Sequence, residues 1–580
     1  MKTTRIAGSA AIIACLLGAA VSCTQSYDTV IIGGGASGTA AGIQSARMGA
    51  STLIVEQGPW LGGMLTSAGV CCIDGNYRMR AGIFGEFTDA IAAHYGGYDK
   101  LRTGWVSNIN FEPHVAESVL ESLAASESRL TVLKNTSYSG LKHLRRGWSL
   151  TIATPDGQSR RIRARVLIDG TELGDVAAEL GIPYRKGFDA KSDTHESIAL
   201  DKALDVVQDI TMVAILKDYG ADADMTISRP EGYDRDRYAN SCDNPLADPS
   251  ATDQALWAPE KMLSYGAISG GKYMINWPIH GNDYYVNLID MSTEEREAAI
   301  REATDITLGF VYFIQTELGM KNIGLADDEF PGGSGIALIP YHRESRRIHA
   351  RVLFTLDDAA KPYEAASPLY RTGIAVGDYP VDHHHHAYLQ RHSLPDLHFY
   401  PIPSFNVPAG VLLPECMEDI IVAEKSIGVT NLINGGTRLQ PVCLQLGQAA
   451  GAMAALAARH GIHPSEVGIR ELQQSILDAG GYIMPYLDLP KGHEHFQALQ
   501  RVGATGIMHG EGRSVGWSNE TWFHAGEPMT EDAIHLEGLP WKREDLPVIT
   551  PGMTREEYAV LLDSTLDLFG QGIDFNGNLK

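Results

Sequence analysis

Three short segments carry residue types that could do chemistry. Gly33, Gly35 and Gly38 form a glycine-rich turn with GxGxxG spacing, and such a turn presents backbone N–H groups to a phosphate. Residues 341–347 bring together one histidine, one glutamate and three arginines, and guanidinium groups bind carboxylates and phosphates through paired hydrogen bonds. Residues 382–386 are one aspartate followed by four histidines, and an imidazole beside a carboxylate is a candidate proton acceptor.

The elements around the glycine turn must position it. The run Tyr27–Ile32 predicts a buried strand before the turn, residues 39–48 an alanine-rich helix, and residues 51–55 a second strand. Glu56 ends that second strand, where a ribose hydroxyl would need an acceptor. This βαβ order predicts a dinucleotide-binding unit rather than a glycine-rich turn without a ligand.

Each residue of the turn has a separate part in that prediction. Gly33 permits the tight turn, Gly35 lets the backbone approach a pyrophosphate, and Gly38 lets the helix pack against the strand. Ala36 and Ser37 begin the helix, whose positive dipole end faces the anion. The motif by itself does not distinguish FAD from NAD.

The residues after the acid add a resemblance. A second glycine pair follows Glu56, and the run 166–168 leads into an Asp-Gly-Thr turn. Here the sequence resembles the FAD-dependent oxidoreductases of the glutathione-reductase-like superfamily, in which comparable stretches lie near the flavin nucleotide. The resemblance implies FAD contacts from Glu56, Gln57, Gly62, Gly63, Met64, Asp169, Gly170 and Thr171.

Three later blocks narrow the resemblance. Residues 339–348 resemble the "RESRRI" block of one bacterial family in that group, related to the flavin subunit of heterodisulfide reductase. Residues 379–384 resemble its "Y-x-x-D-x-H" block, and residues 428–455 its C-terminal flavin-binding helix. The resemblance covers about residues 27–460. It implies that Asp382 and His384 are the pair of interest.

The C-terminal block also has a physical interpretation. Its glycine pair at 435–436 predicts a turn, and Pro441 fits the first turn of a helix. By resemblance the start of that helix faces the flavin, through Gly436, Arg438, Gln440 and Pro441. Some relatives carry iron–sulfur clusters, but the sequence has no CxxC spacing, so we predict no cluster and no metal site.

The polar segments leave alternatives open. If residues 341–347 are helical, Arg343 and Arg347 share a face and could hold a substrate anion; alternatively the arginines form an internal network that braces two domains. On a strand, at most two of the four histidines at 383–386 could enter one cavity. His384 could accept a hydroxyl proton while hydride leaves the adjacent carbon, or the run could bind metal or lie in solvent. His342 is the next candidate base.

The chain divides into four predicted parts after its start, and its fold class is α/β. Residues 27–180 form the first part of a Rossmann-like FAD-binding domain, and 336–480 its returning part with the active-site segments. Residues 181–335 form an inserted α+β substrate domain with strands at 210–216 and 283–289. Residues 485–580 form a small helical appendage that resembles an S-layer-homology-like module. Five aromatic residues of the insertion are candidate ring platforms or core: Trp257, Tyr265, Tyr273, Trp277 and Tyr285.

The first residues predict a targeting signal. Lys2 and Arg5 precede an apolar run, and the small residues before Cys23 resemble a bacterial lipobox. We therefore predict a lipoprotein-type signal peptide over residues 1–23. The protein would then be anchored in the cell envelope, periplasmic or outer-membrane associated; ordinary signal-peptidase cleavage is the alternative. The net charge of −24 makes nucleic acid an unfavourable partner.

These patterns predict an exported FAD-dependent oxidoreductase. It would move hydride between flavin N5 and a small polar metabolite, for example a sugar or hydroxy acid. Because NAD(P)H is absent outside the cytosol, we expect a quinone, a redox protein or oxygen as the electron acceptor. The alternative is an envelope glycan-binding protein on a flavin fold that has lost catalysis, with the C-terminal module as its binding part.

Overall fold

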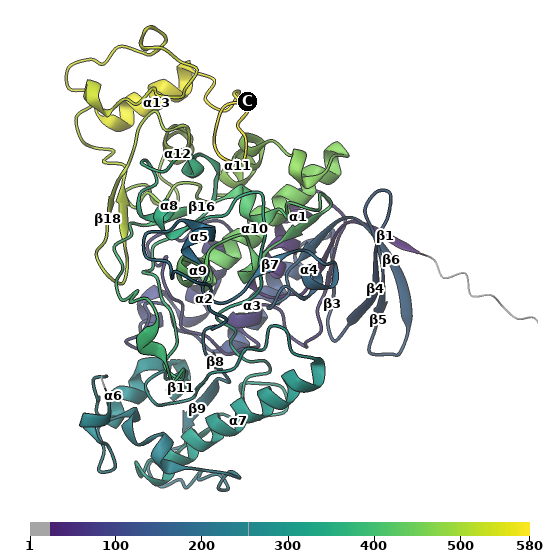
Figure 1. The fold of residues 1–580 in the computed structure, drawn as a ribbon, viewed down its shortest axis with the longest axis vertical. Helices are drawn as coiled ribbons and strands as arrows, with labels where there is room; N and C mark the ends of the chain where they lie inside the picture. The colour runs from purple at the N-terminus through teal and green to yellow at the C-terminus, as the bar shows by residue number, and fades with distance from the viewer. Residues whose placement is uncertain (1–23, 253) are drawn as a thin grey trace, which may run out of the picture.

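The structure is a computed structural model that describes residues 24–252 and 254–580. The predicted signal peptide lies outside the described residues. Figure 1 shows the strands of the large sheet on the right at mid-height, the teal segment around α7 (Thr293–Thr316) at the bottom, and the yellow segment around α13 (Arg555–Thr565) at the top.

A seven-stranded sheet forms the central layer. Its strands lie in the order β3-β2-β1-β6-β5-β4, and β17 also pairs with β6. The parallel strands are β1 (Gln25–Ile32), β2 (Thr52–Val55), β3 (Leu130–Leu133), β6 (Ser159–Asp169) and β17 (Ile420–Val422). The antiparallel strands are β4 (Ser137–His143) and β5 (Trp148–Ala153). β17 completes the sheet from far along the chain, so the returning segment belongs to the same unit as the glycine turn.

The strand β1 is buried on both faces. Val30 pairs with Leu53 on one side and with Leu167 on the other. Ile31 points into the large core and Val30 into a smaller core on the opposite face. Parallel strands covered on both faces are continuous apolar runs, which explains why the sequence predicted this strand correctly.

Two helices pack closely against each other beside the sheet. They are α1 (Ala36–Arg47) and α10 (Gln440–His460). A Cβ placed on Gly447 would lie 2.1 Å from the carbonyl oxygen of Ser37, and one on Gly451 2.2 Å from that of Ala41. α10 is long and apolar enough to cross a membrane, but it is buried inside the fold, as the core helix of a globular protein is.

Shorter elements complete the central unit. The helices are α2 (Gly82–Tyr95), α3 (Pro113–Ala125), α4 (Asp175–Glu179), α5 (Lys191–Thr194), α8 (Leu356–Ala360), α9 (Asn431–Thr437) and α11 (Ile469–Asp478). The paired strands are β7 (Tyr184–Arg185) with β14 (Arg347–Ile348), and β15 (Gly373–Gly377) with β16 (Phe405–Pro408). The predicted turn at residues 435–436 was wrong. Both glycines lie inside α9, where their missing side chains make room for His383 and Phe405.

The middle segment forms its own small sheet. The strand order is β10 (Ala267–Ile268), β11 (Lys272–Ile275), β9 (Ala214–Asp218), β13 (Ile323–Leu325). α6 (Pro259–Leu263) and α7 accompany it, and Phe310 and Trp277 lie in its separate core. The predicted strand at 210–216 is two strands, because β8 (Ile210–Thr211) pairs instead with β12 (Asp283–Tyr284). Of the strand predicted at 283–289, only the two residues of β12 form a strand.

The C-terminal segment is not purely helical. It holds α12 (Phe496–Thr505) and α13, and also the strand pair β18 (Glu511–Arg513) and β19 (Glu520–Trp522). Phe523, Tyr558 and Leu562 belong to the same apolar core as the central unit. The segment is therefore packed onto the rest of the chain, while the predicted domain boundaries stay predictions.

Cysteine chemistry is limited among the described residues. The thiols of Cys71, Cys72, Cys242, Cys416 and Cys443 are all free, and Cys416 is the exposed one. The four buried thiols pack as small apolar groups.

Candidate active site

The glycine turn lines a cavity of about 350 Å3. Gly33 has a φ of +91°, and a Cβ there would lie 2.5 Å from the carbonyl oxygen of Gly170. A Cβ on Gly38 would lie 1.9 Å from the carbonyl oxygen of Gly33. Both positions therefore require glycine, one for the turn and the other for the approach of α1 to the strand end.

The backbone around the turn already binds anionic oxygens. The Gly34 N–H donates to Glu56 Oε2 at 2.6 Å, and the Ser37 N–H at the start of α1 donates to Glu424 Oε2 at 2.7 Å. These donors, at the positive end of a helix dipole, fit the diphosphate of a dinucleotide. Burial raises the pKa of Glu56, against the hydrogen bonds from Gly58 and Gly34.

A buried cluster of charged side chains lies beside the glycine turn, and the sequence did not predict it. Lys425 Nζ lies 2.6 Å from Glu172 Oε2 and 3.0 Å from Glu424 Oε1. Glu424 has a φ of +57°, uncommon for a residue with a side chain. Glu172 Oε1 is buried without a hydrogen-bond partner. Only tertiary packing brings these residues together, since β17 joins the sheet beside β6.

The structure gathers most of the predicted nucleotide contacts. Those that line the cavity are Gly33, Gly35, Glu56, Gln57, Gly63, Gly170 and Thr171. Ala36, Ser37 and Gly38 begin α1, and Gly62 and Met64 flank Gly63 in a short 3-10 turn. Asp169 instead stabilises its own loop, because its carboxylate accepts hydrogen bonds from the backbone N–H groups of Thr171 and Ala177.

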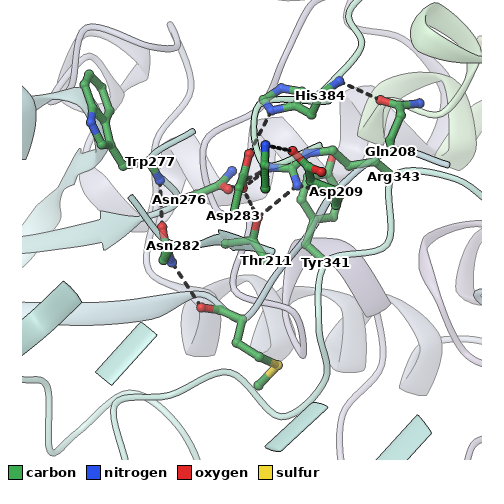
Figure 2. A network of polar contacts seen from close by, with 12 residues as sticks. Gln208, Asp209, Thr211, Asn276, Trp277, Asn282, Asp283, Tyr341, Arg343 and His384 are labelled. Atoms are coloured by element: carbon green, nitrogen blue, oxygen red, sulfur yellow. Dashed lines mark hydrogen bonds and ion pairs between the residues drawn. The ribbon is translucent and has the colours of Figure 1, made fainter. Parts of the chain in front are cut away.

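Of the predicted pair, Asp382 and His384, His384 lies in a polar network with Gln208, Asp283 and Arg343 (Figure 2). His384 Nε2 lies 3.0 Å from Asp382 Oδ2, and Nδ1 lies 3.4 Å from Asp283 Oδ2. The segment is irregular rather than a strand, and His383 turns away toward the carbonyl oxygen of Leu432. His385 packs against Phe188. One histidine of the four thus lies between two carboxylates.

The protonation of this pair follows from its surroundings. Burial and the charge of Arg343 lower the pKa of His384, but Asp382 and Asp283 outweigh them, so the net shift is upward from 6.5. Burial would raise the pKa of Asp382, yet His384 and the arginines hold it well below its usual range. Asp382 therefore stays ionised, and His384 keeps its proton to a higher pH than a free imidazole.

The arginine segment is extended, so the helical alternative was wrong. Arg343 donates to the carbonyl oxygen of Asp209, to Thr211 and to Asn276, and lies 3.3 Å from Asp283. The remaining contacts are also internal: Arg346 pairs with Asp175, and Arg347 with Glu344 and Asp189. The segment is a bracing network. Arg343 positions Asp283 rather than meeting a substrate anion.

His342 points the other way, because successive side chains of an extended segment alternate. It lines the nucleotide cavity, and burial lowers its pKa to about 3. His342 therefore lies in the cavity of the glycine turn rather than with His384. His342 as a base and Arg343 as the holder of a substrate anion stay predictions that these contacts do not favour.

Arg438 connects the network to the start of α10. Its guanidinium donates to Tyr341 Oη at 2.6 Å and to Asp382 Oδ2 at 2.9 Å. Two residues on, Gln440 accepts a hydrogen bond from the Asp74 backbone N–H, and Pro441 lies in the first turn of α10. Burial and the charge of Asp382 raise the pKa of Asp74 to about 7. Asp74 was not predicted, because its partners come from three distant segments.

Comparison with known sequences settles the family. The FAD dependent oxidoreductase family matches residues 28–476. The chain belongs to this family. FAD is therefore its cofactor, and the glycine turn with its backbone donors is the part of the structure that fits the diphosphate. The narrower link to heterodisulfide reductase stays a resemblance.

Solved structures give only distant likenesses. OxyS anhydrotetracycline hydroxylase from Streptomyces rimosus is 13% identical, with 78% of this chain and 66% of that chain covered and a TM-score of 0.34. p-Nitrophenol 4-monooxygenase PnpA from Pseudomonas putida DLL-E4 is 10% identical, with 83% and 88% covered and a TM-score of 0.32. L-proline dehydrogenase from P. horikoshii is 17% identical, and this chain spans only 23% of it, with a TM-score of 0.17. No substrate is inferred from them.

Two other features of the described residues contribute no contact to this site. Glu112, His114 and Glu329 lie close enough to hold a metal ion, but Lys272 Nζ already lies 2.8 Å from Glu112 and 2.9 Å from Glu329. A second cavity, of about 450 Å3, lies between residues 354–370, 401–406 and 484–521. None of the predicted site residues lines it.

Proposed function

We propose that this oxidoreductase oxidises a carbon bearing a hydroxyl group in a polar metabolite, with His384 as the proton acceptor. One observation carries the proposal. His384 lies between two carboxylates, and Asp382 is tied through Arg438 to the start of α10, the segment that by resemblance faces the flavin. The alternative of a glycan-binding protein without catalysis is not favoured by membership of an oxidoreductase family.

The residues would divide the work as follows. Asp283, fixed by Arg343 and Thr211, holds the Nδ1 edge of the imidazole. The Nε2 edge faces Asp382, whose side chain is 30% exposed and so borders open space. A substrate hydroxyl at that edge would give its proton to His384, while the C–H bond breaks with its electron pair and a carbonyl forms. FAD, when bound, supplies the acceptor for that hydride.

Export and electron transfer complete the proposal. If the first residues direct export, electrons leave the protein to a quinone, a redox protein or oxygen, since nicotinamide nucleotides are absent there. A lipid on Cys23 would hold the enzyme at the cell envelope. Mass spectrometry of the mature N-terminus, expressed in a bacterium with lipoprotein processing, tests the anchor: a diacylated Cys23 supports it, and an unmodified new N-terminus contradicts it.

Anaerobic screening of hydroxyl-bearing metabolites for loss of the flavin absorbance near 450 nm tests the reaction. We expect a reductant to be found, and we expect His384→Ala to keep bound FAD but to lower the rate of bleaching by about 10²–10⁴-fold. His94→Ala, an exposed histidine in the last turn of α2, is the control and should bleach at nearly the normal rate. An unchanged rate in His384→Ala would sink the assignment.

A further inference from the structure

Three tryptophans are unusually exposed. Within the described residues the exposed fractions are 41% for Trp105, 40% for Trp257 and 62% for Trp517. They come from segments far apart in the sequence. Burying an aromatic ring away from water stabilises a protein, so a tryptophan that stays exposed often belongs to a surface that binds a ligand or partner.

Trp105 and Trp257 belong to one aromatic cluster. Their ring centroids are 5.9 Å apart, and the Trp105 ring meets Tyr265 edge-on at 5.0 Å. Trp277 supports Tyr265 from inside the middle segment at 5.2 Å. The Trp105 Nε1–H donates to the carbonyl oxygen of Lys261. This Trp105 cluster (Trp105, Trp257, Tyr265) is therefore fixed in place with two exposed rings.

Trp517 belongs to a second cluster, contributed by the C-terminal segment. Its ring lies 4.8 Å from Phe399 and 5.7 Å from Tyr379. Phe399 has a φ of +49°, and strained backbone of this kind concentrates at ligand-binding sites. The loop is fastened to the centre, since the Asn519 N–H donates to the carbonyl oxygen of Asp378. We call this the Trp517 cluster (Trp517, Phe399, Tyr379).

The segment at residues 73–76 contacts both clusters. On the side of the Trp105 cluster, the Ser107 hydroxyl donates to the carbonyl oxygen of Ile73, and the Val106 N–H donates to the carbonyl oxygen of Tyr265. Besides burial, the charges of Asp74 and Asp382 raise the pKa values of Tyr265 and Tyr379. A Cβ on Gly75 would lie 3.1 Å from Tyr379 Cβ, so the Asp74 segment touches the second cluster. The two clusters, which come from distant segments of the chain, thus flank the segment that carries Asp74.

This arrangement favours a neutral ligand with many hydroxyl groups. Arg343 and Arg438, the guanidinium groups of the network, are already paired with carboxylates. The net charge of −24 and the ionised carboxylate of Asp382 disfavour an anion. Carboxylates and phenols suit hydroxyl groups as hydrogen-bond partners, and exposed indole rings offer flat apolar faces to the C–H surface of a sugar ring.

We propose that the two clusters bind a neutral carbohydrate chain of several rings, one of which reaches Asp74, Tyr265, Tyr379 and His384. The inference rests on the proposed function and names its substrate class. The outer rings of the chain stack on Trp257 and Trp517, and the innermost ring presents the hydroxyl that His384 deprotonates.

Calorimetric titration of the FAD-loaded protein tests this, with neutral gluco-, manno-, galacto- and xylo-oligosaccharides of one to six rings. In at least one series we expect affinity to rise about tenfold between one ring and four. Trp517→Ala and Trp257→Ala should each weaken tetrasaccharide binding by about fivefold or more, with single-ring binding nearly unchanged. Val548→Ala, an exposed apolar residue of the same C-terminal segment, is the control.

The outcomes separate the two proposals. The carbohydrate inference is overturned if no oligosaccharide binds. It is also overturned if the affinity depends neither on chain length nor on the two tryptophans. Flavin reduction by a short non-carbohydrate alcohol would in that case leave the proposed reaction standing. If oligosaccharides bind through the tryptophans but no hydroxyl compound reduces the flavin, the reaction fails and the carbohydrate site remains. His384→Ala should bind the chain without reducing the flavin.

Discussion

At the scale of single residues, the decisive feature is an imidazole between two carboxylates of different character. Asp283 is buried with Arg343 and Thr211, so it is a fixed partner. Asp382 is partly open and also binds Arg438. A charged neighbour on each side makes the proton of His384 hard to remove at low pH.

The pH dependence of flavin reduction follows from that. The pKa of His384 is raised above 6.5, so the neutral imidazole that can accept a proton accumulates only as the pH rises through the raised value. We expect the rate to increase with pH, with a midpoint above 6.5. In Asp382→Asn the midpoint should move to lower pH, because one stabilising charge is gone. Stopped-flow reduction from pH 5 to 9 measures it.

The control for this experiment is Asp396→Asn, since Asp396 is exposed and its carboxylate accepts a hydrogen bond from the His398 N–H close by in the sequence. Its profile should match the unmodified protein. A midpoint that stays in place in Asp382→Asn would show that His384 does not set the profile.

A second prediction concerns Glu424. Its carboxylate occupies a donor at the start of α1 that fits a phosphate, so it repels the incoming diphosphate. Glu424→Gln keeps a hydrogen-bond acceptor and removes the charge, and we expect FAD to bind about tenfold more tightly, equivalent to ~1.4 kcal/mol. Quenching of FAD fluorescence on titration measures the affinity. Glu418→Gln, on the surface, is the control, and weaker binding in Glu424→Gln would contradict the argument.

At the scale of elements, the sequence predicted those that depend on local pattern and missed those that depend on tertiary pairing. The strand, glycine turn and helix over residues 25–47 were predictable, because their periodicity and spacing are local. The arginine segment was mistaken for a possible helix because β14 forms only by pairing with β7. Asp283 and Glu424 could not be found, since each acts on a partner about a hundred or more residues away.

The contact between α1 and α10 gives an element-scale prediction. A methyl group on Gly451 would meet the carbonyl oxygen of Ala41, so Gly451→Ala must push the helices apart. We expect a loss of about 1–3 kcal/mol in the free energy of unfolding, the usual cost of overpacking, and weaker FAD retention. Thermal unfolding of the FAD-loaded protein checks it.

Gly526→Ala is the matched control, because a Cβ there meets nothing within 4 Å. It should leave the unfolding temperature nearly unchanged. Equal stability of the two variants would contradict the close helix contact.

At the scale of the whole molecule, the C-terminal segment is part of the main body rather than an attachment. Its Phe523, Tyr558 and Leu562 lie in the core shared with the central sheet and helices, and its Trp517 reaches the rim of the candidate site through Tyr379. The sequence predicted a small helical appendage here, and local signals do not report which core a helix joins.

Truncation tests this arrangement. A chain ending at residue 484 should be poorly soluble or retain little FAD, because it exposes the apolar surface that α12 and α13 cover. Residues 485–580 expressed alone should lack cooperative unfolding. A stable, FAD-loaded truncated protein together with a cooperatively folded fragment would show that the segment is an independent module.

The position of the bound cofactor tests the central claim most directly. A crystal structure of the FAD-loaded protein should place the diphosphate at the N-terminus of α1. The isoalloxazine ring should lie between the start of α10 and the edge of His384, leaving room for a substrate carbon about 3–3.5 Å from flavin N5. A ring bound elsewhere, for example toward the cavity lined by residues 401–406 and 484–521, would contradict the assignment of His384 to the reaction.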